Sequence, residues 1–204
     1  MMIYGAVYPA PNPRRVRMYL AEKGLNPPYT DLDIQKREHK GPLVTGKNSL
    51  GQVPTMVLDD GTMIAESVAI CRYFEALHPE PPLFGKTPLE QANIDMWIRR
   101  LELQVMTPVS MFWVNAHPLT AGLTGQKHKD FGEAQKRRAA ERMIWLSKEI
   151  EGRDYIAGDT FTMADIIAES IVDFAKFIGI PIPEEATALT AWRARIRARP
   201  SSRA

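Results

Sequence analysis

The most informative segment of this 204-residue sequence is Gly51-Gln-Val-Pro-Thr-Met-Val-Leu-Asp-Asp-Gly61, which runs on through Thr-Met-Ile-Ala into Glu66-Ser67. Two short apolar runs lie on either side of Asp-Asp-Gly, a pattern that is typical of a β-hairpin. From about Glu66 to Leu77 the apolar residues have helical spacing. This part of the chain is therefore predicted to fold as strand, strand, helix.

The residues before this segment predict a strand, a helix and a second strand. Residues 3–7 form an apolar run that stops before a proline, as expected for a buried strand. A helix is expected to begin at Asn12 and end at Gly24, because Asn is a favourable N-cap and the proline after it suits a first turn. Residues 29–34 alternate apolar and polar side chains. The order β-α-β followed by β-β-α is that of a thioredoxin-like domain.

The second part of the chain predicts helices only. The run His78-Pro-Glu-Pro-Pro82 does not allow a helix to continue, so residues 79–87 are the predicted linker. Thr162 and Asp165 have the spacing of a capping box, which we interpret as structural. Helices are expected over about 88–116 with a bend near Pro108, 130–151, 163–178 and 184–198. The predicted architecture is α+β in two domains, a thioredoxin-like domain (residues 1–78) followed by an all-α helical bundle (residues 88–204).

The composition excludes several classes of function. Lys and Arg total 26 against 24 Asp and Glu, and residues 1–78 carry 9 of these basic and 8 of these acidic residues, so no nucleic-acid partner is expected. Cys71 is the single cysteine, which excludes an internal disulfide or CxxC pair, and we expect it to be packed in a helix. The four histidines do not have metal-ligand spacing, so no metal is expected.

A cytoplasmic protein without a membrane segment is expected. The first residues have no basic region and reach Pro9 too early for a signal peptide. Residues 103–126 lack charged side chains, but prolines, glycines and polar residues interrupt them too often for a membrane-spanning helix. We expect this uncharged stretch to form part of a pocket wall instead.

Two short motifs favour a site for a small peptide. Val53-Pro54 stands at the start of a predicted strand, and a cis bond there would turn the Val53 N–H and C=O outward to pair with an extended peptide. Glu66-Ser67 lies at a strand-to-helix junction, where backbone N–H groups favour a carboxylate and Glu66 is available for an amine. An ordinary N-cap with an acidic first turn explains Glu66-Ser67 equally well.

Over nearly its whole length the chain resembles the cytosolic glutathione S-transferases. The resemblance rests on the segment quoted above and on residues 12–24, 65–67, 157–165 and 191–201, in this order and spacing. It implies a glutathione transferase fold, glutathione as co-substrate, a small apolar electrophile as second substrate, and a homodimer. By position, Val53 with Pro54 matches the residues that pair with the cysteinyl backbone of glutathione. Glu66 and Ser67 match the γ-glutamyl anchors, and the glycyl carboxylate falls to His39, Lys40 and Gln52.

The chain departs from most of this family where a Tyr, Ser or Cys faces the glutathione sulfur. Ala10 stands there and offers no hydroxyl, as in an atypical microbial subgroup in which a helix N-terminus and a water held from the second domain are thought to stabilise the thiolate. Ser110, in Pro108-Val-Ser110, matches the serine that holds this water. The subgroup's histidine is not matched, which leaves Asn115 or His117 as its substitute. Asn12 is a further catalytic candidate near the sulfur, besides its interpretation as an N-cap.

Methionines and aromatic residues of the uncharged stretch suit an adaptable apolar pocket. The residues expected to line it are Tyr8, Met106, Met111, Trp113 and His117, with Phe112, Phe174 and Phe177 as further candidates. Each of them is also consistent with the core or a dimer interface. The expected reaction is conjugation of the glutathione thiolate to an apolar electrophile. Glutathione-dependent peroxide reduction and a non-catalytic interaction module of the same fold are the alternatives.

Overall fold

The computed structural model describes residues 1–7, 9–121 and 128–204. These residues form two compact units, one made of Met1–Phe84 together with Arg199–Ala204, the other of Gly85–Ala198. The chain passes from the first unit to the second inside the predicted linker. Its last residues belong to the N-terminal unit, although the sequence pattern had placed them with the helices.

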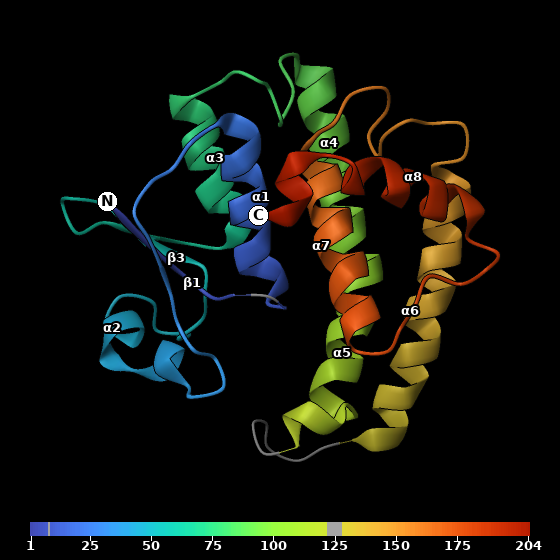
Figure 1. Cartoon of the computed structure of the whole chain (residues 1–204), viewed down its shortest axis with the longest axis horizontal. Coiled ribbons are helices and arrows are strands. Elements are labelled where there is room, and N and C mark those ends of the chain that lie inside the picture. Colours follow the sequence, from blue (N-terminus) through green and yellow to red (C-terminus); the bar gives the residue numbers. More distant parts are fainter. Residues whose placement is uncertain (8, 122–127) are drawn as a thin grey trace. The chain divides into compact units, whose positions relative to one another are not determined.

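The N-terminal unit contains a four-stranded mixed sheet in the order β2-β1-β3-β4 (Figure 1). Its strands are β1 (Met2–Gly5), β2 (Tyr29–Asp31), β3 (Thr55–Val57) and β4 (Met63–Ala65). β1 is parallel to β2 and antiparallel to β3, and β4 is antiparallel to β3. This is the predicted thioredoxin-like arrangement, with strands shorter than the apolar runs suggested.

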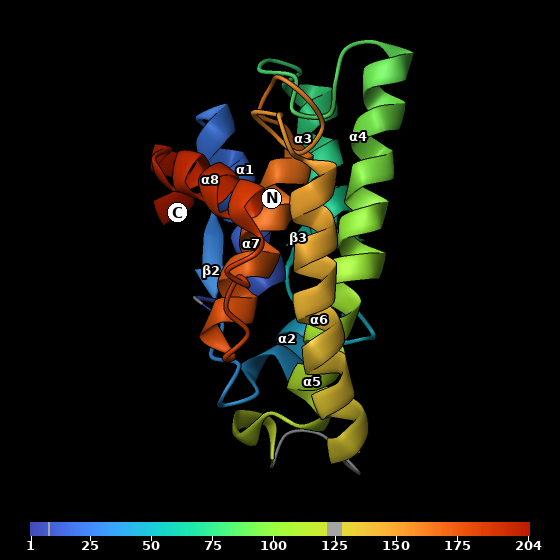
Figure 2. The same ribbon diagram turned by 90° about the vertical axis from the view of Figure 1, so that its right-hand side faces the viewer.

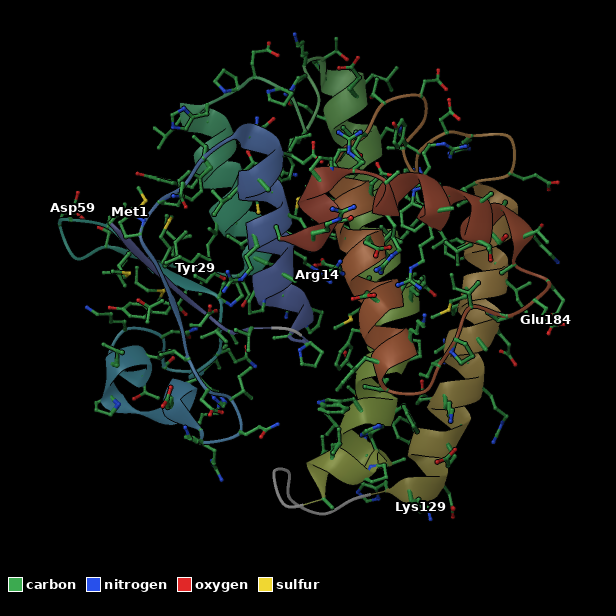
Figure 3. The ribbon with its side chains drawn as sticks, in the orientation of Figure 1. Met1, Arg14, Tyr29, Asp59, Lys129 and Glu184 are labelled. Atoms are coloured by element: carbon green, nitrogen blue, oxygen red, sulfur yellow. The ribbon has the colours of Figure 1, made fainter. Side chains whose placement is uncertain are left out.

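Helices α1 (Pro11–Lys23) and α3 (Ser67–Leu77) of this unit pack against each other, and the short α2 (Pro42–Thr45) follows a 3-10 turn at Glu38–Lys40 (Figure 1). Their inner faces bury Val16, Tyr19, Ile70 and Phe74. At the sheet, the amino group of Met1 forms an ion pair with Asp59, and both are labelled in Figure 3. α1 ends at Gly24, whose φ of 65° lies in the left-handed region that glycine tolerates best.

The prediction that Asn12 caps the first helix is wrong. Ala10 is the N-cap and the helix begins at Pro11, so Asn12 lies within the first turn. Pro11 and Pro13 both fit that turn, because proline has a nearly helical φ and the first turn needs no backbone N–H from them. The helix therefore starts closer to the N-terminus than its first favourable capping residue.

The second unit consists of helices, which are labelled in Figure 2. α7 (Met163–Phe177) is buried along nearly all of its length, and α8 (Thr187–Arg197) packs against α6 and α7. The remaining helices are α4 (Pro88–Arg100), α5 (Thr107–Asn115) and α6 (Lys129–Glu149). The capping box predicted at Thr162 and Asp165 is confirmed.

The bend predicted near Pro108 is a π-helical turn, Leu101–Met106, which joins α4 to α5. The backbone N–H of Thr107 donates to the Glu102 carbonyl across this wide turn, and the Thr107 hydroxyl donates to the same oxygen at 3.0 Å. Pro108 has no N–H to offer the preceding turn, and its ring needs space there. No helix among the described residues is both long and apolar enough to cross a membrane.

Candidate active site

Three segments of the N-terminal unit meet at one end of its sheet. Thr55, the first residue of β3, pairs with Tyr4 of β1 on one side and with Ala65 of β4 on the other. Because these neighbours are antiparallel, the residues that leave β1, enter β3 and leave β4 lie at the same end. These residues include the predicted site positions Ala10 and Asn12, Gln52 to Pro54, and Glu66 with Ser67.

The backbone of Val53 is left without a partner at this end. The Val53–Pro54 peptide bond is cis. In the part of the chain that the structure describes, neither the N–H nor the C=O of Val53 takes part in a hydrogen bond. Unpaired backbone groups next to a strand are a template for pairing with an extended peptide.

A buried amide that the sequence analysis missed holds the loop before β3. Asn48 Nδ2 donates to the Gln52 carbonyl and to Thr55 Oγ1, both at 3.1 Å, and Asn48 Oδ1 accepts from the Leu50 N–H at 3.2 Å. The Thr55 hydroxyl also donates to the Gln52 carbonyl at 2.8 Å. The Gln52 carbonyl is thereby held by two side chains of the protein, Asn48 and Thr55. The available signal was the Asn-Ser-Leu-Gly sequence, since Asn side chains commonly bond backbone groups two residues on.

The junction between β4 and α3 is strained and uncapped. Glu66, the N-cap of α3, has a φ of 68°, which is costly for a residue with a side chain, and makes no side-chain capping bond. Ser67 is buried, and its hydroxyl accepts a long bond of 3.5 Å from Arg15 Nη1. The N–H groups of Ser67 and Val68 have no partner among the described residues. Such a helix end binds carboxylates and other anions.

The N-terminus of α1 is also uncapped, and it exposes few donors. The Ala10 N–H donates to the Val7 carbonyl, and the Arg14 N–H donates to the Ala10 carbonyl at 3.2 Å. Pro11 and Pro13 have no N–H, so Asn12 supplies the remaining first-turn donor. Within the described chain, neither the Asn12 N–H nor its side-chain amide is hydrogen-bonded. The helix dipole and this N–H together favour a negative charge here.

His39 and Lys40 lie against the loop that leads to Val53. Lys40 Nζ donates to the Leu50 carbonyl at 2.9 Å, and a Cβ on Gly51 would come within 3.1 Å of the Lys40 side chain and 3.3 Å of the His39 carbonyl. Burial, together with the charges of Lys40 and Arg37, lowers the pKa of His39 below its usual value. The lowered pKa favours the neutral imidazole of His39.

The aromatic side chains among the predicted pocket residues of the helical unit form one cluster. The Trp113 ring lies 4.7 Å from the His117 ring and 5.4 Å from the Phe174 ring, centroid to centroid, and Phe174 stacks on the exposed Phe177.

The two side chains named as candidate water partners have hydrogen bonds within the protein. Asn115 Nδ2 donates to the Met111 carbonyl at 2.9 Å, and His117 Nδ1 accepts from the Leu119 N–H at 3.3 Å.

The other predicted site residues of the helical unit, Met106, Ser110 and Met111, are half-buried. Met106 ends the π-helical turn, and Ser110 and Met111 belong to α5. Tyr8 lies outside the residues that the structure describes. Cys71 is fully buried as predicted, and burial raises the pKa of its thiol. Among residues 1–7, 9–121 and 128–204 there is no group of three side chains able to hold a metal ion.

Comparisons with known proteins agree for both parts of the chain. Residues 10–77 match the N-terminal domain model of glutathione S-transferases, and residues 101–200 match the C-terminal domain model. Glutathione S-transferase 2 of Saccharomyces cerevisiae is 41% identical over 98% of this chain and 87% of its own length.

Solved structures lead to the same family. The crystal structure of Gtt2 from Saccharomyces cerevisiae superposes with a TM-score of 0.91 at 40% identity, covering 100% of this chain and 99% of that one. A glutathione S-transferase domain-containing protein of Marinobacter aquaeolei has a TM-score of 0.92 at 38% identity, with coverage of 99% and 100%. On sequence and fold together, the chain belongs to the glutathione S-transferase family.

Proposed function

We propose that this protein binds glutathione at the end of the sheet next to Ala10, Val53 and Glu66, and joins the glutathione sulfur to apolar electrophiles as a thioether. One observation carries the proposal: two uncapped helix N-termini and an unpaired strand backbone converge at one place. Together they offer a ligand two anion sites and a peptide-pairing edge. An extended tripeptide with a thiol in its middle residue has the matching groups.

Each part of glutathione has a proposed partner. The main chain of its cysteinyl residue pairs with the N–H and C=O of Val53. Its γ-glutamyl carboxylate is bound by the first-turn N–H groups of α3 and the Ser67 hydroxyl, and its ammonium by Glu66. The glycyl carboxylate is bound by Lys40, with His39 and the side-chain amide of Gln52 as hydrogen-bond donors. Gln52 is exposed, so its side-chain amide is available to the ligand.

The thiol is activated without a protein hydroxyl in this proposal. A free thiol has a pKa of about 8.5, and a helix N-terminus lowers it by stabilising the thiolate. The Asn12 N–H is the donor in the first turn of α1 that remains for the sulfur. The thiolate then attacks the electrophilic atom. The thiol proton is released to water when the thiolate forms. In a substitution, the sulfur–carbon bond forms as the bond to the leaving group breaks, and the leaving group keeps that electron pair. In an addition, the π electron pair of the double bond moves to the neighbouring atom, which then takes a proton from water.

Two parts of the proposal rest on the helical unit. Ser110 is proposed to bind a water that supports the thiolate, and its removal in Ser110→Ala should raise the pKa of the bound thiol. Trp113, Met106, Met111 and His117 are proposed to contact the electrophile, because half-buried aromatic and methionine side chains bind varied apolar molecules. A Ser110→Ala variant with an unchanged thiol pKa would remove this residue from the mechanism.

A pair of matched ligands tests the binding and the activation separately. Calorimetric titration should give similar affinities for glutathione at acidic pH and for ophthalmic acid, which has a methyl group in place of the thiol. Ultraviolet titration of bound glutathione should then give a thiol pKa at least one unit below the free value of about 8.5. If the protein binds neither glutathione nor ophthalmic acid, the proposal is wrong.

The same titration separates the alternatives. An interaction module would bind glutathione weakly or not at all and would leave its thiol pKa near the free value. A peroxidase would depress the pKa but turn over cumene hydroperoxide faster than chlorodinitrobenzene. We expect chlorodinitrobenzene to be the better substrate, because conjugation needs only the thiolate and an apolar pocket.

A homodimer completes the proposal. Leu89 and Met96 are exposed and seven residues apart on α4, so they share one face, and the exposed Leu103 follows in the π-helical turn. An exposed apolar stripe of this length is a common site of helix–helix association. Sedimentation should show a dimer in the wild type and a monomer in Met96→Glu, and a monomeric wild type would contradict this part of the proposal.

A further inference from the structure

The end of the chain is packed on α1, the helix whose N-terminus is proposed to hold the thiolate. The segment Arg199–Ala204, called here the C-terminal segment, belongs to the N-terminal unit and contains a 3-10 turn at Pro200–Arg203. It contacts α1, as the position of the chain end in Figure 1 also shows. Ser201 and Ser202 are buried there. None of the residues of this segment is among the proposed glutathione anchors.

One contact of the C-terminal segment is made at the last turn of α1. Arg199 approaches Glu22 in a bidentate manner, with Nε at 2.9 Å from Oε1 and Nη2 at 2.8 Å from Oε2. The Ser201 hydroxyl donates to the same carboxylate. Burial opposes ionisation of Glu22, but the bonds from Arg199 and Ser201 outweigh it and lower the pKa of this carboxyl. A bidentate arginine–carboxylate pair fixes the orientation of the two side chains as well as their positions.

The second contact is made at the first turn of α1. The buried Arg14, labelled in Figure 3, donates from Nη2 to the Ser202 carbonyl at 2.9 Å. The backbone N–H of the same residue donates to the Ala10 carbonyl and so closes the first turn of the helix. Arg14 therefore connects the C-terminal segment to the turn that contains the Asn12 N–H.

We infer that Glu22 and Arg199 are positioning residues for the thiol site, acting through the C-terminal segment and Arg14 on the first turn of α1. The inference rests on the proposed function. The pair sits at one end of α1 and the thiolate is proposed at the other, eight or more residues away, so neither side chain touches the sulfur. Fixing the segment at Glu22 sets the position of Ser202, and Ser202 sets that of Arg14.

The experiment uses the full chain with Glu22→Gln, Arg199→Gln and the charge-exchanged double variant Glu22→Arg with Arg199→Glu. In each single variant, hydrogen exchange at the Arg14 amide should become several-fold faster, and the KM for glutathione should rise roughly three- to tenfold. The pKa of the bound thiol should rise by about 0.5 unit, whereas kcat at high pH and saturating glutathione should stay unchanged. The double variant should restore all three values at least partly.

Arg195→Gln is the matched control. Arg195 belongs to the helical unit and pairs with Asp154 at a more exposed position, so its loss removes an arginine–carboxylate pair and an arginine charge without touching the C-terminal segment. It should leave the Arg14 amide and the thiol pKa unchanged.

The outcomes separate this inference from the proposed function. Unchanged exchange at the Arg14 amide in the folded single variants overturns the connection, whatever the protein binds. Faster exchange with an unchanged thiol pKa shows a merely structural contact and overturns the positioning role. A wild type that does not bind glutathione overturns the proposed function and the positioning role together, while the exchange data still report the connection. Loss of exchange protection with a raised thiol pKa, both reversed by charge exchange, supports the inference.

Discussion

Two helices of the helical unit and two helices of the N-terminal unit begin in opposite ways. In the helical unit, α4 and α7 each start with a complete capping box, Thr87 with Glu90 and Thr162 with Asp165. In the N-terminal unit, α1 and α3 start at Ala10 and Glu66 without any side-chain cap. A capped end has satisfied its own donors and is closed to ligands, whereas an uncapped end keeps them for something else. Stability and binding thus compete for the same backbone N–H groups.

The largest effect is expected from opening the α7 end with Asp165→Ala. The carboxylate is fully buried and accepts bonds from the Ile156 and Thr162 N–H groups and from Trp192 Nε1 at 2.8–2.9 Å. Its loss leaves these buried donors unpaired, so the free energy of unfolding should fall by about 3 kcal/mol or more in chemical denaturation.

The control for this change is Glu90→Ala, which removes the exposed carboxylate of the other capping box and should cost clearly less. The thiol pKa of bound glutathione should be the same in the wild type and in whatever Asp165→Ala protein remains folded. A shift of that pKa would contradict the division between closed and open helix ends.

The next effect concerns the strained start of α3. Glu66→Gly should raise the free energy of unfolding by about 1 kcal/mol, because glycine adopts a positive φ without strain. At the same time glutathione affinity, measured by calorimetry, should fall about tenfold with the loss of the ammonium partner. Arg37→Gly is the matched control, since Arg37 also has a positive φ of 60° and is not a proposed anchor. A similar stabilisation there, with unchanged affinity, is expected; equal affinity losses would remove Glu66 from the site.

A smaller effect is expected from closing the α1 end with Ala10→Asp. The new carboxylate would accept from the Asn12 N–H and cap the helix, which should stabilise the protein by about 1 kcal/mol. It would also repel the thiolate, so the thiol pKa should return toward about 8.5. Ala10→Asn separates the two causes, because it caps without a charge. A thiol pKa that stays depressed in Ala10→Asp would mean that the sulfur lies elsewhere.

The smallest effect is expected from Asn12→Ala, which removes the unbonded amide and keeps the backbone N–H. The free energy of unfolding should change by less than about 0.5 kcal/mol, and the thiol pKa by only a small fraction of a unit. A rise of one unit or more in the ultraviolet titration would transfer the activating role from the backbone to the side chain.

The sequence predicted best where local chemistry is self-contained. The Thr162 and Asp165 capping box and the glycine that ends α1 are confirmed because each needs only its immediate neighbours. The start of α1 was predicted wrongly, since the polar Asn12 looked like a cap while two prolines allowed an earlier start. No local pattern distinguishes those two outcomes.

Long-range partners explain most of what the sequence did not reveal. Val53 and Glu66 were singled out from their motifs and from the resemblance, but it is the pairing of β3 with β1 and β4 that places them at one end of the sheet. The role of Asn48 depends on bonds to Gln52 and Thr55, which only the folded loop brings within reach. The contact of Arg199 with Glu22 joins residues 177 positions apart, and no spacing rule predicts it.

The unpaired backbone of Val53 also has a consequence for turnover. If glutathione pairs there as proposed, recognition involves the main chain and the two ends of the tripeptide, and none of these groups changes when the sulfur is alkylated. The finished thioether would then bind about as well as the starting thiol and would lose only the attraction between its charge and the α1 N-terminus. Product inhibition competitive with glutathione is the expected result, and release of the conjugate becomes a step that can limit the rate.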